Sequence, residues 1–492
     1  ILLLLFCIGL SMAQTVVRLN QVGYLPNAPK HFEIPVQRGV ADSFTVQRLS
    51  GQAVFKGALR QAALDEASAE NLRRGDFSNV KDTGCFQLRI GTHTSPAFRI
   101  SEHLYDRLAF DAANAFHLIR ANVALNDTIG GVHVFHAVAH QQDSSLLGRD
   151  LRGGWYNAGD YGKWTHEAAF SIANMLWLYE YKPGIANNIK GFLDEIRWGL
   201  DWLFKMQTDS GAVLHKVDTE GCWGWGKGPD ADTCTRQASF QEKGNMKPST
   251  VDAAALSAVM AQAYRSFKTV DKPLAQRCST AATLSWEWVQ RNLTEGQRDP
   301  YYTLNSPAPM VTWAAGEIYT LNGDLEALAL FRKNFAGAAP NEPTWANPEF
   351  FGYLALANSK ITPKPLRDSV SKSIAASSSN FMEQSKESGF GQALSTADYY
   401  WGSNAHVLGK AMVMIADYEI NKNKQARATA LSQLDYLLGR NALGISMVTG
   451  YGSLRTMQPY HWIYKAYDAI MPGWVSGGPN YYPSGADDAL ST

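Results

Sequence analysis

The spacing of hydrophobic residues along this chain changes once, near residue 101. From Val16 to about Ile100, apolar and polar residues alternate in short runs such as 43–49 and 85–90, and turn residues separate the runs. A period of two in short runs is typical of antiparallel strands with one buried face. We therefore predict a β-sandwich over 14–100.

After Ser101 the period becomes about 3.6, which predicts amphipathic helices. Ser249 precedes one of these segments and Asp252 lies in its first turn, where a capping hydroxyl and a carboxylate favour a helix start. We expect an all-α domain over 101–492. The eleven predicted helices are 104–122, 165–181, 189–206, 249–267, 274–291, 309–320, 323–335, 347–358, 363–381, 403–419 and 425–438.

Three long stretches, 126–164, 207–248 and 439–492, lie between or after the predicted helices. They hold most of the Gly, Trp and Asp residues that suit a reactive site. Long loops inside a compact domain are usually functional, so we expect the active site there.

The amino-acid composition indicates which class of molecule this protein binds. The 45 Lys and Arg balance the 45 Asp and Glu, and no basic block occurs of the kind that follows a phosphate backbone. This excludes nucleic acid and favours a neutral substrate. The 14 Trp, 21 Tyr and 21 Phe supply flat rings on which sugar faces stack, although most of them are expected in the core.

The first ten residues are almost wholly apolar, and small residues precede Gln14. This pattern predicts a secretion signal over 1–13, and we expect the chain to begin inside that signal because the usual Met and basic residues are missing. The segment is too short to span a membrane, so we expect a secreted protein without a membrane partner. In an exported protein Cys222 and Cys234 either form a disulfide or remain free buried thiols.

One loop carries Gly153-Gly-Trp-Tyr-Asn-Ala-Gly-Asp-Tyr-Gly-Lys-Trp164. This stretch closely resembles the signature of glycoside hydrolase family 9, which reads Asp where this chain has Asn157. Further stretches agree in family order: 211–217, 401–404, 434–444 and 446–452. The opening Val17-Arg-Leu-Asn-Gln-Val-Gly-Tyr24 is similar to the start of the immunoglobulin-like domain that precedes the catalytic domain in one branch of the family.

The resemblance implies an immunoglobulin-like sandwich followed by a toroid of six α-hairpins. It also implies hydrolysis of β-1,4-glycosidic bonds in cellulose or a related β-glucan, with inversion of configuration. Since the toroid needs twelve helices and the pattern predicts eleven, we expect the last helix beyond Thr492.

Asp160 matches the family's general base, the carboxylate that takes a proton from the attacking water. The alternative is that Asp160 only caps the helix beginning near Trp164. Asn157 replaces the family's second Asp, which helps to hold that water. An amide still binds water but adds no charge, so we expect a slower enzyme or a shifted pH optimum.

A second departure from the family is at Gln458-Pro-Tyr-His-Trp462, where the family usually reads Pro-His-His-Arg. Tyr460 then replaces a substrate-binding His, unless a one-residue shift lets His461 serve. Either alignment predicts a subsite remodelled toward stacking. The residues predicted to bind substrate are Trp155, Tyr156, His215, Trp401, Tyr460 and His461.

The family's proton donor is a Glu in an Asn-Glu pair, some tens of residues after Gly-Gly-Pro. Gly477-Gly-Pro479 is present, but no Glu follows it, and Asp487 and Asp488 are read as loop residues. We expect the donor beyond Thr492, which predicts little hydrolysis by the chain as given.

No cofactor is expected. Some relatives bind a structural zinc through two Cys and two His, but here Ala121 and Ala139 occupy the Cys positions and only His140 is kept. Zinc is therefore not expected, while a structural calcium held by oxygen ligands stays open. Two alternatives to an endo-acting glucanase also remain: an exo-acting hydrolase of cello-oligosaccharides or glucosamine polymers, and a sugar-binding protein without turnover.

Overall fold

The computed structural model describes residues 16–37, 40–219, 222, 226–242 and 245–481. The predicted secretion signal, 1–13, and the acidic residues Asp487 and Asp488 lie outside these ranges. Within them, none of the helices combines the length and the hydropathy that crossing a lipid bilayer would require.

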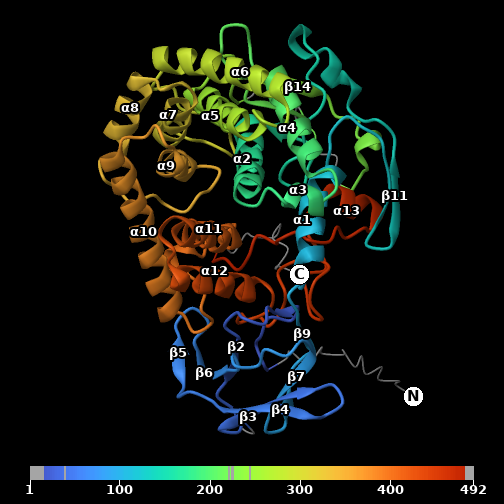
Figure 1. Ribbon diagram of the computed structural model, residues 1–492. Coiled ribbons are helices and arrows are strands. Elements are labelled where there is room, and N and C mark those ends of the chain that lie inside the picture. The colour runs from blue at the N-terminus through green and yellow to red at the C-terminus, as the bar shows by residue number, and fades with distance from the viewer. Residues whose placement is uncertain (1–15, 38–39, 220–221, 223–225, 243–244, 482–492) are drawn as a thin grey trace, which may run out of the picture.

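The strands of the N-terminal part form two sheets, which lie at the bottom of Figure 1. One sheet has the order β1-β9-β7-β3-β4, with β8 paired to β7, and the other has the order β2-β6-β5. Only β1 and β9 run parallel; the other pairs are antiparallel. The strands are β1 (Gly23–Tyr24), β2 (His31–Pro35), β3 (Ser43–Arg48), β4 (Ala53–Ala58), β5 (Ala63–Asp65), β6 (Glu70–Asp76), β7 (Gly84–Ile90), β8 (His93–Thr94) and β9 (Phe98–Ile100).

The alternating pattern explains this sandwich. Phe44 and Val46 of β3 are buried against the other sheet, while their neighbours along the strand are partly exposed. In β2 the central three residues are all buried, including Glu33. One face of β2 belongs to the sandwich core and the other faces the helical domain. The predicted immunoglobulin-like sandwich is confirmed.

All eleven predicted helices are present, and their bounds differ from the prediction by a few residues in most cases. The sequence pattern did not reveal two short helices, α3 (Ile185–Asn188) and α13 (Trp462–Tyr467). The long helices are α1 (Asp106–Leu118), α2 (Thr165–Tyr181), α4 (Phe192–Met206), α5 (Thr250–Phe267), α6 (Lys272–Arg291), α7 (Ala308–Asn322), α8 (Leu325–Phe335), α9 (Glu349–Asn358), α10 (Lys364–Glu387), α11 (Ser403–Asn421) and α12 (Lys424–Leu437).

These helices form two concentric layers (Figure 1). Helices α2, α5, α7, α9 and α11 pack in that order as the inner layer, and each also packs on a following outer helix: α4, α6, α8, α10 or α12. Helix α5 is buried along almost its whole length, as an inner position requires. Gly316 of α7 and Gly352 of α9 let these two helices approach closely, because a Cβ on Gly316 would lie 2.7 Å from the Gly352 carbonyl oxygen.

The sandwich packs below α12 through a buried polar interface (Figure 1). Gln21 donates its backbone N–H to the Leu438 carbonyl and its side-chain amide to the Gly444 carbonyl. Glu33 of β2 lies 3.7 Å from Arg440, and both side chains are fully buried. This buried ion pair joins a residue of the sandwich to a residue of the helical domain.

The long loops that connect the helices contain short strands and 3-10 turns. Strands β12 and β14 both pair with β13 in a small antiparallel sheet beside the start of α2. The loop elements are β10 (Leu125–Ile129), β11 (Val132–His136), β12 (Lys163–Trp164), β13 (Lys216–Thr219) and β14 (Arg236–Ser239), with the 3-10 turns η1 (Gln141–Ser144), η2 (Leu146–Gly148), η3 (Pro229–Ala231) and η4 (Thr396–Asp398).

Candidate active site

A tight turn before α2 positions Asp160. Ala158 and Gly159 both have positive φ, 54° and 84°, and Gly159 packs so closely that a Cβ there would lie 2.6 Å from the Tyr460 carbonyl oxygen. The backbone N–H of Gly162 donates to Asp160 Oδ1 at 2.7 Å. These contacts fix the carboxylate in a loop that is only partly exposed.

The environment of Asp160 suits a base. Burial raises its pKa to about 7; the Gly162 N–H lowers the pKa and the negative charge of Asp218 raises it. A carboxylate with a pKa near neutrality accepts a proton readily and still ionises at mild pH. The alternative role as a helix cap is not supported, because Trp164 occupies the N-cap of α2 and no described side chain caps that helix.

Asn157 lies three residues before Asp160 in the same turn. Its side chain contacts the loop that precedes α7. Its side-chain amide nitrogen donates to the hydroxyl of Tyr302 at 3.2 Å. The ring of Tyr302 packs edge-on against Trp164 and Trp345. Three separate loops, those before α2, α7 and α9, therefore meet at this point.

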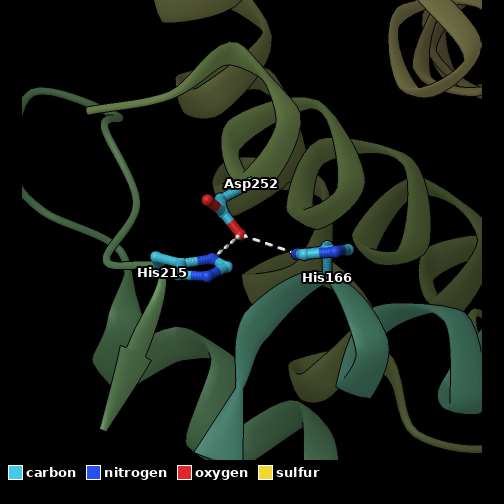
Figure 2. Close-up of side chains that lie close together, drawn as sticks. All are labelled: His166, His215 and Asp252. Atoms are coloured by element: carbon cyan, nitrogen blue, oxygen red, sulfur yellow. Dashed lines mark hydrogen bonds and ion pairs between the residues drawn. The ribbon is translucent and has the colours of Figure 1, made fainter. Parts of the chain in front are cut away.

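His215 and His166 lie on either side of Asp252 and both contact its carboxylate (Figure 2). The Nδ1 of His215 is 3.1 Å from Asp252 Oδ1, and the Nδ1 of His166 is 3.2 Å from the same oxygen. On the other side, His215 Nε2 lies 3.6 Å from Asp299, which accepts a hydrogen bond from Lys216 at 2.6 Å. Burial alone would lower the pKa of His215, but the two carboxylates raise it to about 9.

The side chain of His215 has 0% exposed area, so it does not touch a sugar in this arrangement. Its predicted substrate contact is therefore corrected to a structural role. His215 holds Asp252, whose carboxylate also accepts a hydrogen bond from the hydroxyl of Ser249, the N-cap residue of α5.

Trp155 and Tyr156 also differ from the prediction. The indole N–H of Trp155 donates to Glu195 at 2.6 Å, and the ring is buried against Phe116. The Tyr156 hydroxyl lies 2.7 Å from Nδ1 of the buried His140. Both side chains are buried and form hydrogen bonds inside the protein, so neither ring offers a face to a ligand.

The altered motif at 458–462 lies next to the turn. Tyr460 is partly exposed and touches Gly159, so its ring stands beside the Asn157–Asp160 segment. His461 is buried against Trp474, its Nδ1 accepts from the backbone of Ile463, and burial lowers its pKa to about 3. Of the two alignments left open, the geometry favours Tyr460 as the residue facing a substrate.

Trp401 stands on the surface at the entrance to α11, with 60% of its area exposed. Next to it, Tyr400 packs against His406, whose Nδ1 bonds Glu342 at 2.7 Å. Single exposed aromatic rings are normal on protein surfaces, and such a ring offers a flat face on which a sugar can stack. The predicted contact of Trp401 with the substrate stays a prediction.

The disulfide between Cys222 and Cys234 is formed. Three groups of side chains within the described ranges lie close enough to hold an ion: His166 with His215 and Asp252, Glu342 with Asp398 and His406, and Asp232 with the two disulfide cysteines. The sulfurs of the third are already bonded to each other. His140, the residue kept from the zinc pattern, contacts Tyr156 and Asp232.

Asp218, Tyr302 and Trp345 also lie around this site, but the sequence pattern did not indicate them as site residues. Asp218 directly follows the 211–217 motif, which was the available signal for it. Nothing in the chain pattern indicated that the segments holding Tyr302 and Trp345 would reach the turn.

Comparison with known proteins shows the family of this chain. A family model described as "Glycosyl hydrolase family 9" matches residues 105–490, most of the chain. The chain belongs to glycosyl hydrolase family 9. A second model, described as "Cellulase N-terminal ig-like domain", matches residues 12–95. The predicted enzyme class, a glycoside hydrolase of the cellulase type with an immunoglobulin-like domain, is confirmed.

Individual family 9 relatives are similar along nearly the whole chain. A cellodextrinase of Butyrivibrio fibrisolvens is 29% identical over 94% of this chain and 90% of the relative. Endoglucanase C of Cellulomonas fimi is 28% identical over 94% of this chain, which spans 47% of that longer protein. A solved metagenome-derived family 9 endoglucanase superposes with a TM-score of 0.85 at 28% identity, covering 95% of this chain and 91% of that one.

Proposed function

We propose that this protein hydrolyses β-1,4-glycosidic bonds in cellulose or a related β-glucan with inversion of configuration. The observation that carries the proposal is Asp160, a partly exposed carboxylate with a pKa of about 7 beside Tyr460 and Tyr302. Family membership supplies the reaction class, and the site supplies a base suited to it.

In this mechanism a water attacks the anomeric carbon from the face opposite the leaving group. Asp160 accepts one proton of that water as the new carbon–oxygen bond forms and the glycosidic bond breaks. Asn157 lies beside this water, and its side-chain amide nitrogen donates to the Tyr302 hydroxyl. The leaving oxygen takes a proton from the glutamate that the resemblance expects after Gly477-Gly-Pro479.

Trp401 and Tyr460 bind the sugar chain by stacking. Stacking on rings needs no charge, which agrees with a neutral glucan as partner. The exposed position of Trp401 favours an open binding surface and therefore endo action. The similarity to a cellodextrinase supports, as the second candidate, exo action on short cello-oligosaccharides. We further propose that the protein is secreted, on the apolar pattern of 1–10.

The test is Asp160→Asn in the full-length protein, with Asp150→Asn as the matched control. Asp150 is an exposed acid of the same long loop and pairs with Arg152. Loss of a base should lower kcat by roughly 10²–10⁴ while Kd for cellohexaose stays the same, because only the transition state uses the base.

Calorimetry gives Kd, and release of reducing sugar gives kcat. If the Asp160 variant loses binding and turnover to the same degree, the role of Asp160 is structural. If it binds cellohexaose but the wild type releases no sugar from any β-glucan, the protein is a binding relative without turnover.

A further inference from the structure

Asp218 of β13 reaches the same glycine as Asp160. The pairing of β12 with β13 sets Lys163 opposite Val217 and Trp164 opposite Lys216, which continues to Gly162 opposite Asp218. A Cβ on Gly162 would lie 2.9 Å from Asp218 Oδ1, while the Gly162 N–H donates to Asp160 Oδ1 at 2.7 Å. The two carboxylates therefore converge on Gly162 from two different strands and loops.

Asp218 is held firmly but is not neutralised by a close partner. Its Oδ1 accepts from the backbone N–H of Thr219 at 2.7 Å. Among the described residues its ion-pair partner is Lys216, whose Nζ lies 3.7 Å from Oδ2 and makes its shorter contact, 2.6 Å, to Asp299. The side chain keeps 17% of its area exposed, so it is not sealed off from the solvent.

We propose that Asp218 is the second carboxylate of the water-binding site and positions the attacking water together with Asp160, in place of the charge that Asn157 lacks. This inference rests on the proposed hydrolysis. Asp218 accepts a hydrogen bond from the second O–H of the water and gains no proton. Asp160 takes the proton that leaves, so the step balances as in the mechanism above.

The charges around Asp160 predict a pH effect. The groups that face it are Asp218 and Lys216 from β13, Arg236 from β14, and Tyr301 and Tyr302 from the loop before α7. Asp218 raises the pKa of Asp160, whereas Arg236 and Lys216 lower it. Removing the charge of Asp218 should therefore move the acid limb of the pH–rate profile to lower pH.

The experiment compares Asp218→Asn with Asp209→Asn in the full-length protein. Asp209 lies in an exposed turn just before β13 and serves as the charge control. Loss of one charge-assisted contact to the water should lower kcat about 10- to 100-fold with little change in KM. Adding Asn157→Asp to the Asp218→Asn variant should restore both kcat and the acid limb, because the charge returns to the other side of the water.

Asp218→Glu provides a second variant that keeps the charge and displaces it. Because the charge remains, the acid limb of the pH–rate profile should stay where it is in the wild type. Because the carboxylate is displaced from the water, kcat should fall. Unchanged kcat and an unchanged acid limb in Asp218→Asn, or equal changes in the control, would overturn the inference.

A measurement independent of turnover separates this inference from the proposed function. Carbon-13 NMR titration of the Asp160 carboxyl should show a lower pKa in Asp218→Asn than in the wild type. If that shift occurs but the wild type hydrolyses no β-glucan, the proposed function fails and the coupling stands. If the wild type hydrolyses glucan and the Asp160 titration does not move, the inference fails alone.

Discussion

Asp252→Asn tests the buried cluster that Asp252 forms with His166 and His215. The Asp252 carboxylate contacts Nδ1 of both His166 and His215 and accepts from Ser249, and no part of it is exposed. An amide of the same shape removes the negative charge and leaves His215 with Asp299 at 3.6 Å as its main counter-charge. The substitution therefore isolates the charge from the packing.

The magnitude follows from the pKa of His215, which rises from 6.5 to about 9 on folding. A shift of about 2.5 units corresponds to ~3 kcal/mol, within the range for breaking a buried pair. Because the folded pKa is raised, this stabilisation is fully present below about pH 6.5 and is lost as pH rises through 9. Because Asp299 and Glu167 also raise this pKa and remain in the variant, we expect Asp252→Asn to lower the free energy of unfolding by at most ~3 kcal/mol at pH 6 and by much less at pH 10.

Guanidinium unfolding followed by circular dichroism at pH 6, 7.5 and 10 measures this difference. Asp194→Asn is the matched control, since Asp194 also lies in a first helical turn but is largely exposed beside Arg197. The control substitution should lower the free energy of unfolding by less than ~1 kcal/mol. A loss in Asp252→Asn that equals the control, or that does not diminish with pH, would refute the reasoning.

Two further variants test other parts of the account. Trp401→Ala should weaken cellohexaose binding by ~1 kcal/mol, about fivefold in Kd by calorimetry. Leu325→Ala, at an even more exposed apolar position on α8, should leave Kd unchanged. Arg440→Met should lower the free energy of unfolding by ~3 kcal/mol, because the buried Asp435 loses its main cation while Glu33 keeps its 2.7 Å pair with Arg74. An unchanged denaturation midpoint would show that the interface does not depend on this charge.

The helices could be predicted from the sequence because each carries enough residues for a 3.6-residue period to be visible. The short helix at 462–467 could not, since six residues hold less than two turns. The alternating runs of the first hundred residues likewise predicted the sandwich. Periodicity, however, does not say that Glu33 faces Arg440 across the domain interface, because that contact joins residues far apart in the chain.

The candidate site was predictable only in part. The signature led to Asp160 and Asn157, which the structure places in one tight turn. His215 was assigned to the substrate because its motif resembles the family's, but a motif does not show on which side of the loop a side chain lies. Asp218 was missed because its proximity to Asp160 depends on the register between β12 and β13, which no local pattern reveals.

The stereochemistry of the first product tests the central claim most directly. Proton NMR of cellohexaose, recorded within the first minutes after addition of the full-length protein, distinguishes the two anomers of the new reducing end. Hydrolysis with Asp160 as base should release the α-anomer first, followed by slow equilibration to the β-anomer. Initial release of the β-anomer, or no cleavage of cellohexaose at any pH between about 5 and 9, would contradict the account.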